Sequence, residues 1–201
     1  MQDFIIYGIV IAPVVYFITI IIFDLLLRGF APFLPSRPWV VEQLLGEIKI
    51  NKKNPKFIAF STGRSGFFHA LEKRYPDAEL IAVENNVFPY IISKIQGLIR
   101  RTRIKVTYQK IHRVNVKEAD LIYSHLDPDG IRQVDSKFKF ECKPGALVIS
   151  TGFNMPVLKI KKEINLEDRK GRFDFLSKNQ KLFQRSGKKF KKEKKAYFYE
   201  I

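Results

Sequence analysis

The chain has 201 residues, a formal net charge of +16 and a single cysteine, Cys142. One cysteine excludes an internal disulfide, no Cys/His cluster has the spacing of a metal site, and no Ser/His/Asp order indicates a hydrolase. The charge is uneven, because residues 151–201 hold 15 Lys and Arg against 6 Asp and Glu, a net of +9. We therefore expect an anionic partner at that end.

An apolar segment lies at the start of the chain. Residues Phe4 to Phe23 read FIIYGIVIAPVVYFITIIIF, 20 residues without a charge. At about 1.5 Å per residue such a helix spans roughly 30 Å, the thickness of the hydrocarbon core of a bilayer. A cleaved signal peptide is the alternative, but Met1-Gln2-Asp3 has no basic residue and no small-x-small cleavage site follows. The sequence therefore predicts a retained single-pass transmembrane anchor.

Charges beside this segment predict its orientation. Asp3 precedes it, whereas Arg28, Arg37 and Lys49 follow it. Because basic residues favour the cytosolic side of a membrane, we expect the C-terminal domain on that side. A lone cysteine fits a reducing compartment.

A connector joins the anchor to the rest of the chain. Three prolines stiffen APFLPSRP (residues 31–38), and Ser36 is placed to cap a helix over about Arg37 to Glu47. We therefore divide the chain into an anchor (1–28), a connector with a leading helix (29–54) and an α/β domain (55–201).

Short β-rich runs then alternate with helical patterns. The expected strands are Lys56–Ser61, Glu79–Glu84, Ile104–Ile111, Asp120–Leu126 and Ala146–Thr151, and the expected helices are Gly66–Tyr75, Phe88–Arg100 and Asp129–Phe138. This alternation predicts a doubly wound, mostly parallel sheet covered on both faces. A last strand, Ala196–Ile201, is expected to form an antiparallel hairpin with the stretch before Gly187.

Candidate site residues follow the predicted strands, where open α/β sheets bind ligands. The turn from Ser61 to Gly66 contains small residues that let the backbone approach a ligand, although many strand–helix turns share this composition. Glu84 comes about 20 residues later, at the spacing of a carboxylate that accepts hydrogen bonds from a ribose. A surface glutamate at a strand end is the alternative for Glu84.

The end of the fourth predicted strand carries His125 and Asp127. Asp127 is suited to orienting an acceptor amine or taking its proton, and His125 to acting as a base. A capping aspartate and a packed or exposed histidine are the alternatives. Phe67 and Phe68, after the glycine turn, are expected to be helix core.

Several stretches together resemble a known family. They are APFLPSRPWVVEQLL, FIAFSTGRSG, AVENN, ADLIYSHLDP and KPGALVISTGFNMP. The chain resembles the membrane-anchored class I S-adenosylmethionine-dependent methyltransferases of the protein-lysine type. The resemblance implies a Rossmann-like fold and S-adenosyl-L-methionine as cofactor, held by Ser61, Gly63, Ser65, Gly66, Glu84 and Asn85. It also implies an acceptor lysine on a membrane-associated protein, placed near His125 and Asp127.

The glycine turn departs from the pattern of these enzymes. They carry an acidic residue at the end of the first strand and a D-x-G-x-G-x-G loop, whereas here Ala59 or Ser61 stands at the acidic position and the glycines are Gly63 and Gly66. A catalytically silent scaffold that binds anionic lipid or a protein partner is therefore the second hypothesis. A nicotinamide-dependent oxidoreductase is third, because GRSG lacks the G-x-G-x-x-G fingerprint.

The basic run from Arg185 to Lys195 suggests the anionic partner. Lys188 to Lys195 would bind lipid head groups at about 1 kcal/mol per basic residue near the surface. A solvated hairpin loop is the alternative. Nucleic acid is disfavoured because no known binding module is present.

Overall fold

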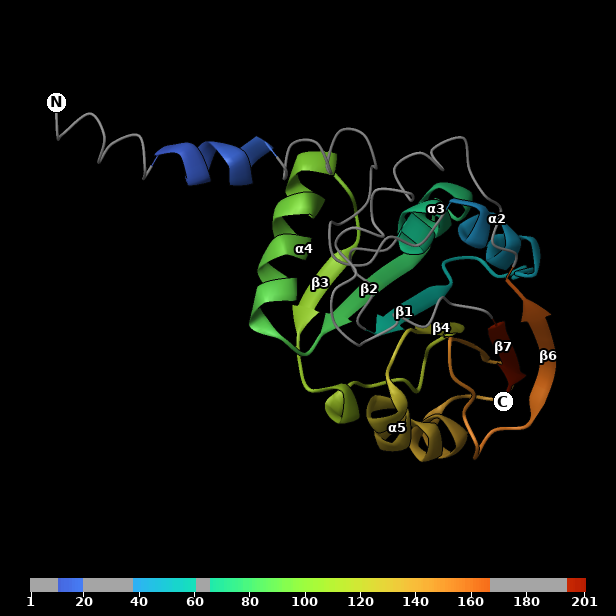
Figure 1. Ribbon diagram of the computed structural model, residues 1–201. Coiled ribbons are helices and arrows are strands. Elements are labelled where there is room, and N and C mark those ends of the chain that lie inside the picture. The colour runs from blue at the N-terminus through green and yellow to red at the C-terminus, as the bar shows by residue number, and fades with distance from the viewer. Residues whose placement is uncertain (1–10, 20–37, 61–65, 167–194) are drawn as a thin grey trace, which may run out of the picture.

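The computed structural model of the chain describes residues 11–19, 38–60, 66–166 and 195–201 (Figure 1). The strands of these residues form one seven-stranded sheet in the order β3-β2-β1-β4-β5-β7-β6. Their bounds are β1 Lys56–Phe60, β2 Glu79–Glu84, β3 Lys105–Tyr108, β4 Leu121–Ser124, β5 Leu147–Thr151, β6 Ile160–Asn165 and β7 Lys195–Glu200. Strands β1 to β5 are parallel, whereas β7 pairs antiparallel with both β5 and β6.

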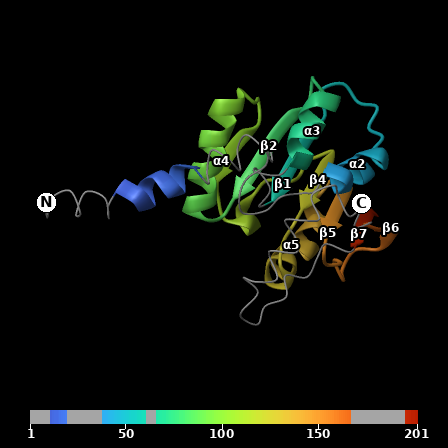
Figure 2. The same cartoon turned by 45° about the horizontal axis from the view of Figure 1, so that its top comes forward.

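Helices cover both faces of this sheet. They are α2 (Pro38–Gly46), α3 (Gly66–Arg74), α4 (Val87–Arg100) and α5 (Pro128–Glu141), with a short 3-10 helix η2 (Ile111–Arg113). The chain steps outward from β1 to β2 to β3, so right-handed crossovers place α3 and α4 on the same face. Figures 1 and 2 show α5 on the opposite face. The prediction of a doubly wound, mostly parallel sheet is confirmed.

Strand β1 shows how the core is divided between the two faces. Phe57 and Ala59 belong to a cluster that includes side chains of α2 and α3. Ile58 and Phe60 belong to a second cluster that includes side chains of α5. All four side chains are at most 1% exposed. A strand buried on both faces reads as a continuous apolar run, which is why FIAF was recognisable in the sequence.

The outermost strands of the sheet beyond β5 differ from the expectation. The stretch directly before Gly187 lies outside the described residues, and the strand found next to β7 is β6. Five of the six β6 residues are exposed. Their sequence, IKKEIN, has neither the apolar run nor the clear alternation that predicts a strand. Its backbone pairing with β7, a long-range contact, forms the strand.

Part of the predicted anchor is described. Residues 11–19 are helical, and the remainder of Phe4–Phe23 lies outside the described residues, as do Ser36 and most of the connector. Within the described ranges, no helix has both the length and the apolar composition needed to cross a membrane. The nine helical residues include six large apolar side chains that are 50–68% exposed, Ile11, Val14, Val15, Tyr16, Phe17 and Ile18.

Asp120 fastens the amino ends of three strands. Its carboxylate accepts hydrogen bonds from Lys52 Nζ at 2.8 and 3.0 Å and from the Lys56 amide at 2.9 Å, and it pairs with Lys143 Nζ at 2.6 Å. Its own amide donates to the Lys56 carbonyl, and its carbonyl accepts from the Leu147 amide. Burial alone would raise the pKa of Asp120, but the hydrogen bonds from Lys143, Lys52 and the Lys56 amide outweigh it and lower the pKa below its ordinary value.

The lowered pKa of Asp120 predicts acid sensitivity. Asp120→Asn should reduce the free energy of unfolding at neutral pH by about 1.5–3 kcal/mol, the range for hydrogen bonds to charged groups. An unfolded aspartate has a pKa of about 3.9, so the stabilisation is complete above that value and is lost as the pH falls through the lower folded-state pKa. Denaturant unfolding at several pH values should show the two proteins converging in acid.

Asp129→Asn is the control for this measurement, because Asp129 is 74% exposed and its pair with Arg132 lies on the surface. Its effect should stay below about 1 kcal/mol. The assigned role of the Asp120 carboxylate would be contradicted if the wild type kept its full advantage in free energy of unfolding over Asp120→Asn in strong acid.

Two phenylalanines on α5 test the packing of the second cluster. Phe138 is fully buried with its ring centroid 5.4 Å from that of Phe60, whereas Phe140 is 78% exposed. Phe138→Ala should lower the free energy of unfolding by about 3–5 kcal/mol. Phe140→Ala should change it by no more than about 0.5 kcal/mol. Equal effects of the two substitutions in thermal or denaturant unfolding would show that α5 is not packed as described.

Candidate functional site

The carboxyl ends of the parallel strands bring the predicted site residues to one edge of the sheet. In the strand register Phe60 lies beside both Val83 and Ser124, and Ser124 lies beside Ser150. Glu84, the next residue of β2, is therefore at the edge from which the turn after β1 leaves. Of the predicted turn, Gly66 is described as the buried first residue of α3, whereas Ser61, Gly63 and Ser65 lie outside the described residues.

Buried polar side chains gather at this edge. Glu84, Ser124, Ser150 and Thr151 are all at most 2% exposed. Burying polar groups is unfavourable unless they find hydrogen-bond partners. Ser150 Oγ donates to the Phe153 carbonyl at 2.6 Å, but Ser124 Oγ is buried with no partner among the described residues. The edge therefore has a polar interior of the kind that receives a ligand.

Glu84 occupies the end of β2, directly before the α4 helix. Its carbonyl accepts a hydrogen bond from the Gln109 amide at 3.0 Å, which ties it to the chain beyond β3. Asn85 follows it and is exposed. Glu84 is therefore not the surface glutamate that was the alternative, because its carboxylate is enclosed.

Tyr108 is an addition that the sequence analysis missed. It lies beside Glu84 in the register of β2 and β3, it is 55% exposed, and its ring centroid is 5.8 Å from that of Tyr90. Exposed aromatic faces of this kind can stack on a flat heterocycle. An aromatic residue at the carboxyl end of the third strand was the available signal.

His125 and Thr151 join the ends of β4 and β5. His125 Nδ1 lies 2.8 Å from Thr151 Oγ1, and the Tyr123 hydroxyl lies 3.4 Å from the same oxygen. In the tautomer whose Nδ1–H donates to Thr151 Oγ1, Nε2 carries the lone pair for base chemistry. Thr151 fixes the orientation of the imidazole, a contact that no local pattern indicated.

Asp127 is the N-cap of α5. Its Oδ1 accepts a hydrogen bond from the Gly130 amide at 2.8 Å. Gly130 has little free space, because a Cβ there would lie 3.0 Å from that oxygen and 3.1 Å from Leu126 Cβ. Asp127 is therefore a capping aspartate, the alternative given for it above. Its side chain is exposed beside the site.

The first turn of α3 is part of the core. Phe67 and Phe68 are fully buried, and the Phe67 ring centroid is 4.3 Å from that of Tyr123. Their predicted role as helix core is confirmed. Through Tyr123, Phe67 holds the start of α3 against β4, the strand that directly precedes His125.

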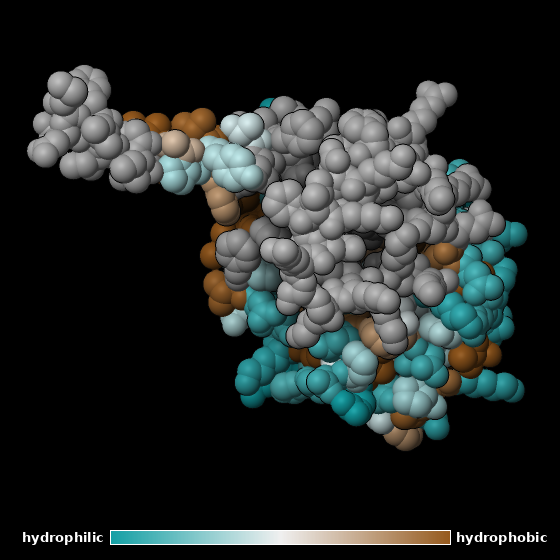
Figure 3. Space-filling model, viewed as in Figure 1, coloured by the Kyte–Doolittle hydropathy of each residue, from teal (hydrophilic) through white to brown (hydrophobic). Residues whose placement is uncertain are grey.

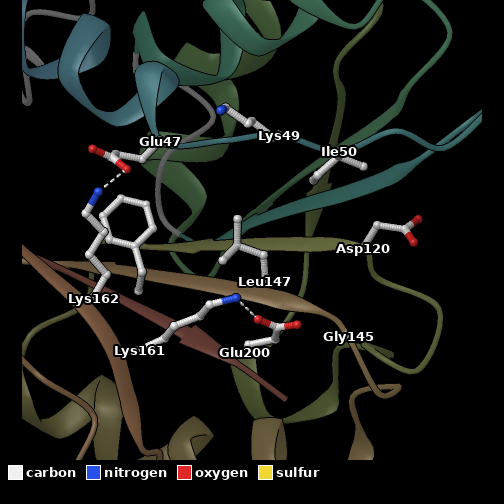
Figure 4. A pocket seen from close by; sticks show the side chains of 10 residues that line it. Glu47, Lys49, Ile50, Asp120, Gly145, Leu147, Lys161, Lys162 and Glu200 are labelled. Carbon is white, nitrogen blue, oxygen red and sulfur yellow. Dashed lines mark hydrogen bonds and ion pairs between the residues drawn. The ribbon is translucent and has the colours of Figure 1, made fainter.

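A separate cavity lies at the opposite edge of the sheet (Figure 4). It has a volume of about 400 Å³, and its lining includes Asp120, Leu147 and Phe198, near the amino ends of the parallel strands. Four of its other charged side chains form ion pairs, Lys162 with Glu47 and Lys161 with Glu200. Across the described ranges, no group of His, Cys, Asp and Glu could hold a metal ion. The buried polar side chains gather at the carboxyl edge, which is the candidate site.

Comparison with known proteins finds similarity in structure. No protein-family model matches the chain, and no curated protein matches it. The RNA methyltransferase from Salinibacter ruber, in complex with S-adenosyl-L-homocysteine, matches with a TM-score of 0.59 at 13% identity, over 84% of this chain and 94% of that one.

Two further structures match comparably. The geranyl diphosphate C-methyltransferase from Streptomyces coelicolor matches with a TM-score of 0.57 at 8% identity, over 80% of this chain and 77% of that one. The M1A22 tRNA methyltransferase from B. subtilis matches with a TM-score of 0.54 at 12% identity, over 80% of this chain and 64% of that one. At these identities the likeness is one of fold, and the chain has the fold of the class I S-adenosylmethionine-dependent methyltransferases.

Proposed function

We propose that the protein is an S-adenosylmethionine-dependent methyltransferase. The observation that carries this proposal is the enclosed carboxylate of Glu84 at the carboxyl end of β2, within a sheet of methyltransferase topology. A carboxylate at the end of the second strand is placed to accept hydrogen bonds from the hydroxyls of a ribose.

The residues at this edge fit such a cofactor. Glu84 would accept hydrogen bonds from the ribose, with Asn85 beside it, and the Tyr108 face would lie against the adenine. The buried hydroxyl of Ser124 offers a further polar contact. The turn from Ser61 to Gly66 would hold the methionine part through its backbone. The cofactor supplies an electrophilic methyl group bonded to a sulfonium sulfur.

The acceptor in this proposal is a lysine of a membrane-associated protein. Transfer needs a neutral amine in line with the methyl carbon, so that the N–C bond forms as the C–S bond breaks. Desolvation favours the neutral amine, and His125 or Asp127 would take the proton released. The uncharged segment from Phe4 to Phe23 and the exposed apolar helix at 11–19 support attachment to a membrane. Basic residues after that segment favour a cytosolic domain.

A catalytically silent scaffold is the second candidate. The observation that favours it is the turn sequence STGRSG, which lacks the acidic residue and the third glycine of the methyltransferase loop. Such a scaffold would bind anionic lipid or a protein partner through Lys188–Lys195, of which the structure describes Lys195.

Cofactor binding separates the two candidates. Titration calorimetry of the full chain in detergent micelles with S-adenosylmethionine should detect saturable binding. Glu84→Gln keeps the shape of the side chain and removes its charge, so it should weaken binding about tenfold to a hundredfold, the equivalent of about 1.5–3 kcal/mol for a charge-assisted hydrogen bond.

Glu79→Gln is the matched control, because Glu79 begins the same strand and pairs with Lys105 at the far edge. Its affinity for the cofactor should equal that of the wild type. Absence of heat at millimolar cofactor, in protein whose unfolding transition is intact, would reject the enzyme and leave the scaffold.

The role of Asp127 can be divided by two substitutions. Asparagine accepts the same hydrogen bond from Gly130, so Asp127→Asn should preserve the free energy of unfolding, whereas Asp127→Ala should lower it by about 1 kcal/mol. Urea unfolding measures both. If asparagine proves as destabilising as alanine, the charge of Asp127 and not its cap is what stabilises α5.

A further inference from the structure

Helix α4 presents an apolar face to solvent. Val87, Ile91, Ile95, Leu98 and Ile99 are between 47% and 81% exposed. Their spacing places them on one side of the helix. Figure 3 shows hydrophobic surface in brown at the left of the molecule, where Figure 1 places α4. Contiguous exposed apolar surface of this kind marks an interaction site.

The polarity of α4 is the reverse of that of an ordinary surface helix. Ser93 and Gln96 are buried, at 1% and 5% exposure, on the side toward the sheet. Ser93 Oγ has no hydrogen-bond partner among the described residues. A helix with polar residues inside and isoleucines outside is not explained by packing within this domain. Such a polarity indicates a partner outside the domain.

The charged residues of α4 and its C-cap are all positive. Helix α4 contains no acidic residue. Within the described part of the chain, neither Lys94 nor Arg101 forms an ion pair. Arg101 adopts φ 50°, a left-handed conformation that favours glycine, so a side chain is kept there against a backbone cost. The outer face thus combines apolar side chains with unneutralised cations.

A groove continues the face toward the edge strand. It has a volume of about 530 Å³ between α4 and β3. Ile95, Leu98 and Val106 give it apolar walls, and Lys94 and Arg101 also line it. Tyr90 lies under Lys94, whose Nζ is 5.1 Å from the ring centroid. Amphipathic tyrosines and lysines with long apolar stems are typical of a membrane interface.

Charge decides among the possible occupants. A second copy docked through the same face would bring Lys94 and Arg101 against like charges, with no acid on α4 to offset them. The chain's own apolar segment, Phe4–Phe23, is uncharged and would leave the cations unpaired. An anionic bilayer accepts both features, because its acyl boundary receives the isoleucines and its head groups receive the cations.

We propose that the outer face of α4 lies on the anionic surface of a lipid bilayer, as an interfacial helix separate from the N-terminal segment. Because α4 begins three residues after Glu84, this contact keeps the carboxyl edge of the sheet close to the membrane. The site then lies near acceptors at the bilayer surface. The contact does not depend on methyl transfer, and its test measures no activity.

The test uses the full chain with an environment-sensitive fluorophore on a single introduced cysteine. Leu98→Cys and Ile91→Cys report on the α4 face, and Phe140→Cys is the matched control on the opposite face of the sheet. The native thiol does not interfere, because burial raises the pKa of Cys142 to about 12 and keeps it unreactive. The labelled proteins are mixed with vesicles of phosphatidylcholine, with or without phosphatidylserine, and separated by flotation.

With phosphatidylserine, the Leu98 and Ile91 labels should shift to the blue and lose most of their quenching by aqueous acrylamide. The Phe140 label should remain in water. Salt should reverse the shift, since the attraction acts over a Debye length of about 8–10 Å. If the protein floats with the vesicles while acrylamide still quenches all three labels, the docking of α4 is rejected and attachment through the N-terminal segment is retained. Failure to float at all would overturn both.

Charge variants sharpen the result. Arg101→Gly removes a cation from a position whose backbone suits glycine, so the protein should remain folded. Arg101→Gly and Lys94→Gln should each weaken the interfacial response to anionic lipid about fivefold, the factor for about 1 kcal/mol per basic residue. Shielding of the α4 labels without lipid, with self-quenching that grows with protein concentration, would identify a second copy as the occupant and refute the proposal.

Discussion

The structure depends on one constraint, that a parallel strand buried on both faces must be covered by helices on each side. Strand β1 illustrates this constraint, because Phe57 and Phe60 belong to clusters on different faces of the sheet and neither is exposed. The helices that satisfy it arrive by right-handed crossovers, so every strand from β1 to β5 ends at the same edge. The convergence of Glu84, Ser124 and Thr151 is a consequence of this geometry.

The two edges of the sheet divide stability from recognition. At the amino edge, Asp120 is satisfied by Lys52, Lys143 and the Lys56 amide, and the neighbouring cavity is lined largely by paired charges. At the carboxyl edge, polar groups are buried and Ser124 Oγ lacks a described partner. Buried polar groups with hydrogen-bond partners add to stability. Buried polar groups without a full set of partners reduce it and are typical of ligand-binding sites.

Helix α4 connects the site to the surroundings of the protein. Its first residue follows Glu84 and Asn85 closely, and its outer face is the apolar one. A single element therefore touches both the proposed cofactor pocket and the proposed bilayer contact. The reversed polarity of the helix also explains why periodicity predicted its bounds well but not its orientation, since an apolar stripe does not tell whether a sheet or a lipid surface will cover it.

The sequence by itself determined the elements whose burial is evident from a local pattern of apolar residues. Strand β2 runs over Glu79–Glu84 as expected, and the alternation of strands and helices was sufficient to predict the parallel sheet and to place Glu84 at its carboxyl edge. The tertiary structure decided what depends on distant partners. It made the polar segment IKKEIN a strand through pairing with β7, oriented His125 through Thr151, and exposed the apolar face of α4. The physical reason is that periodicity encodes which residues avoid water, whereas backbone pairing and side-chain hydrogen bonds join groups far apart in the chain, which a local pattern does not specify.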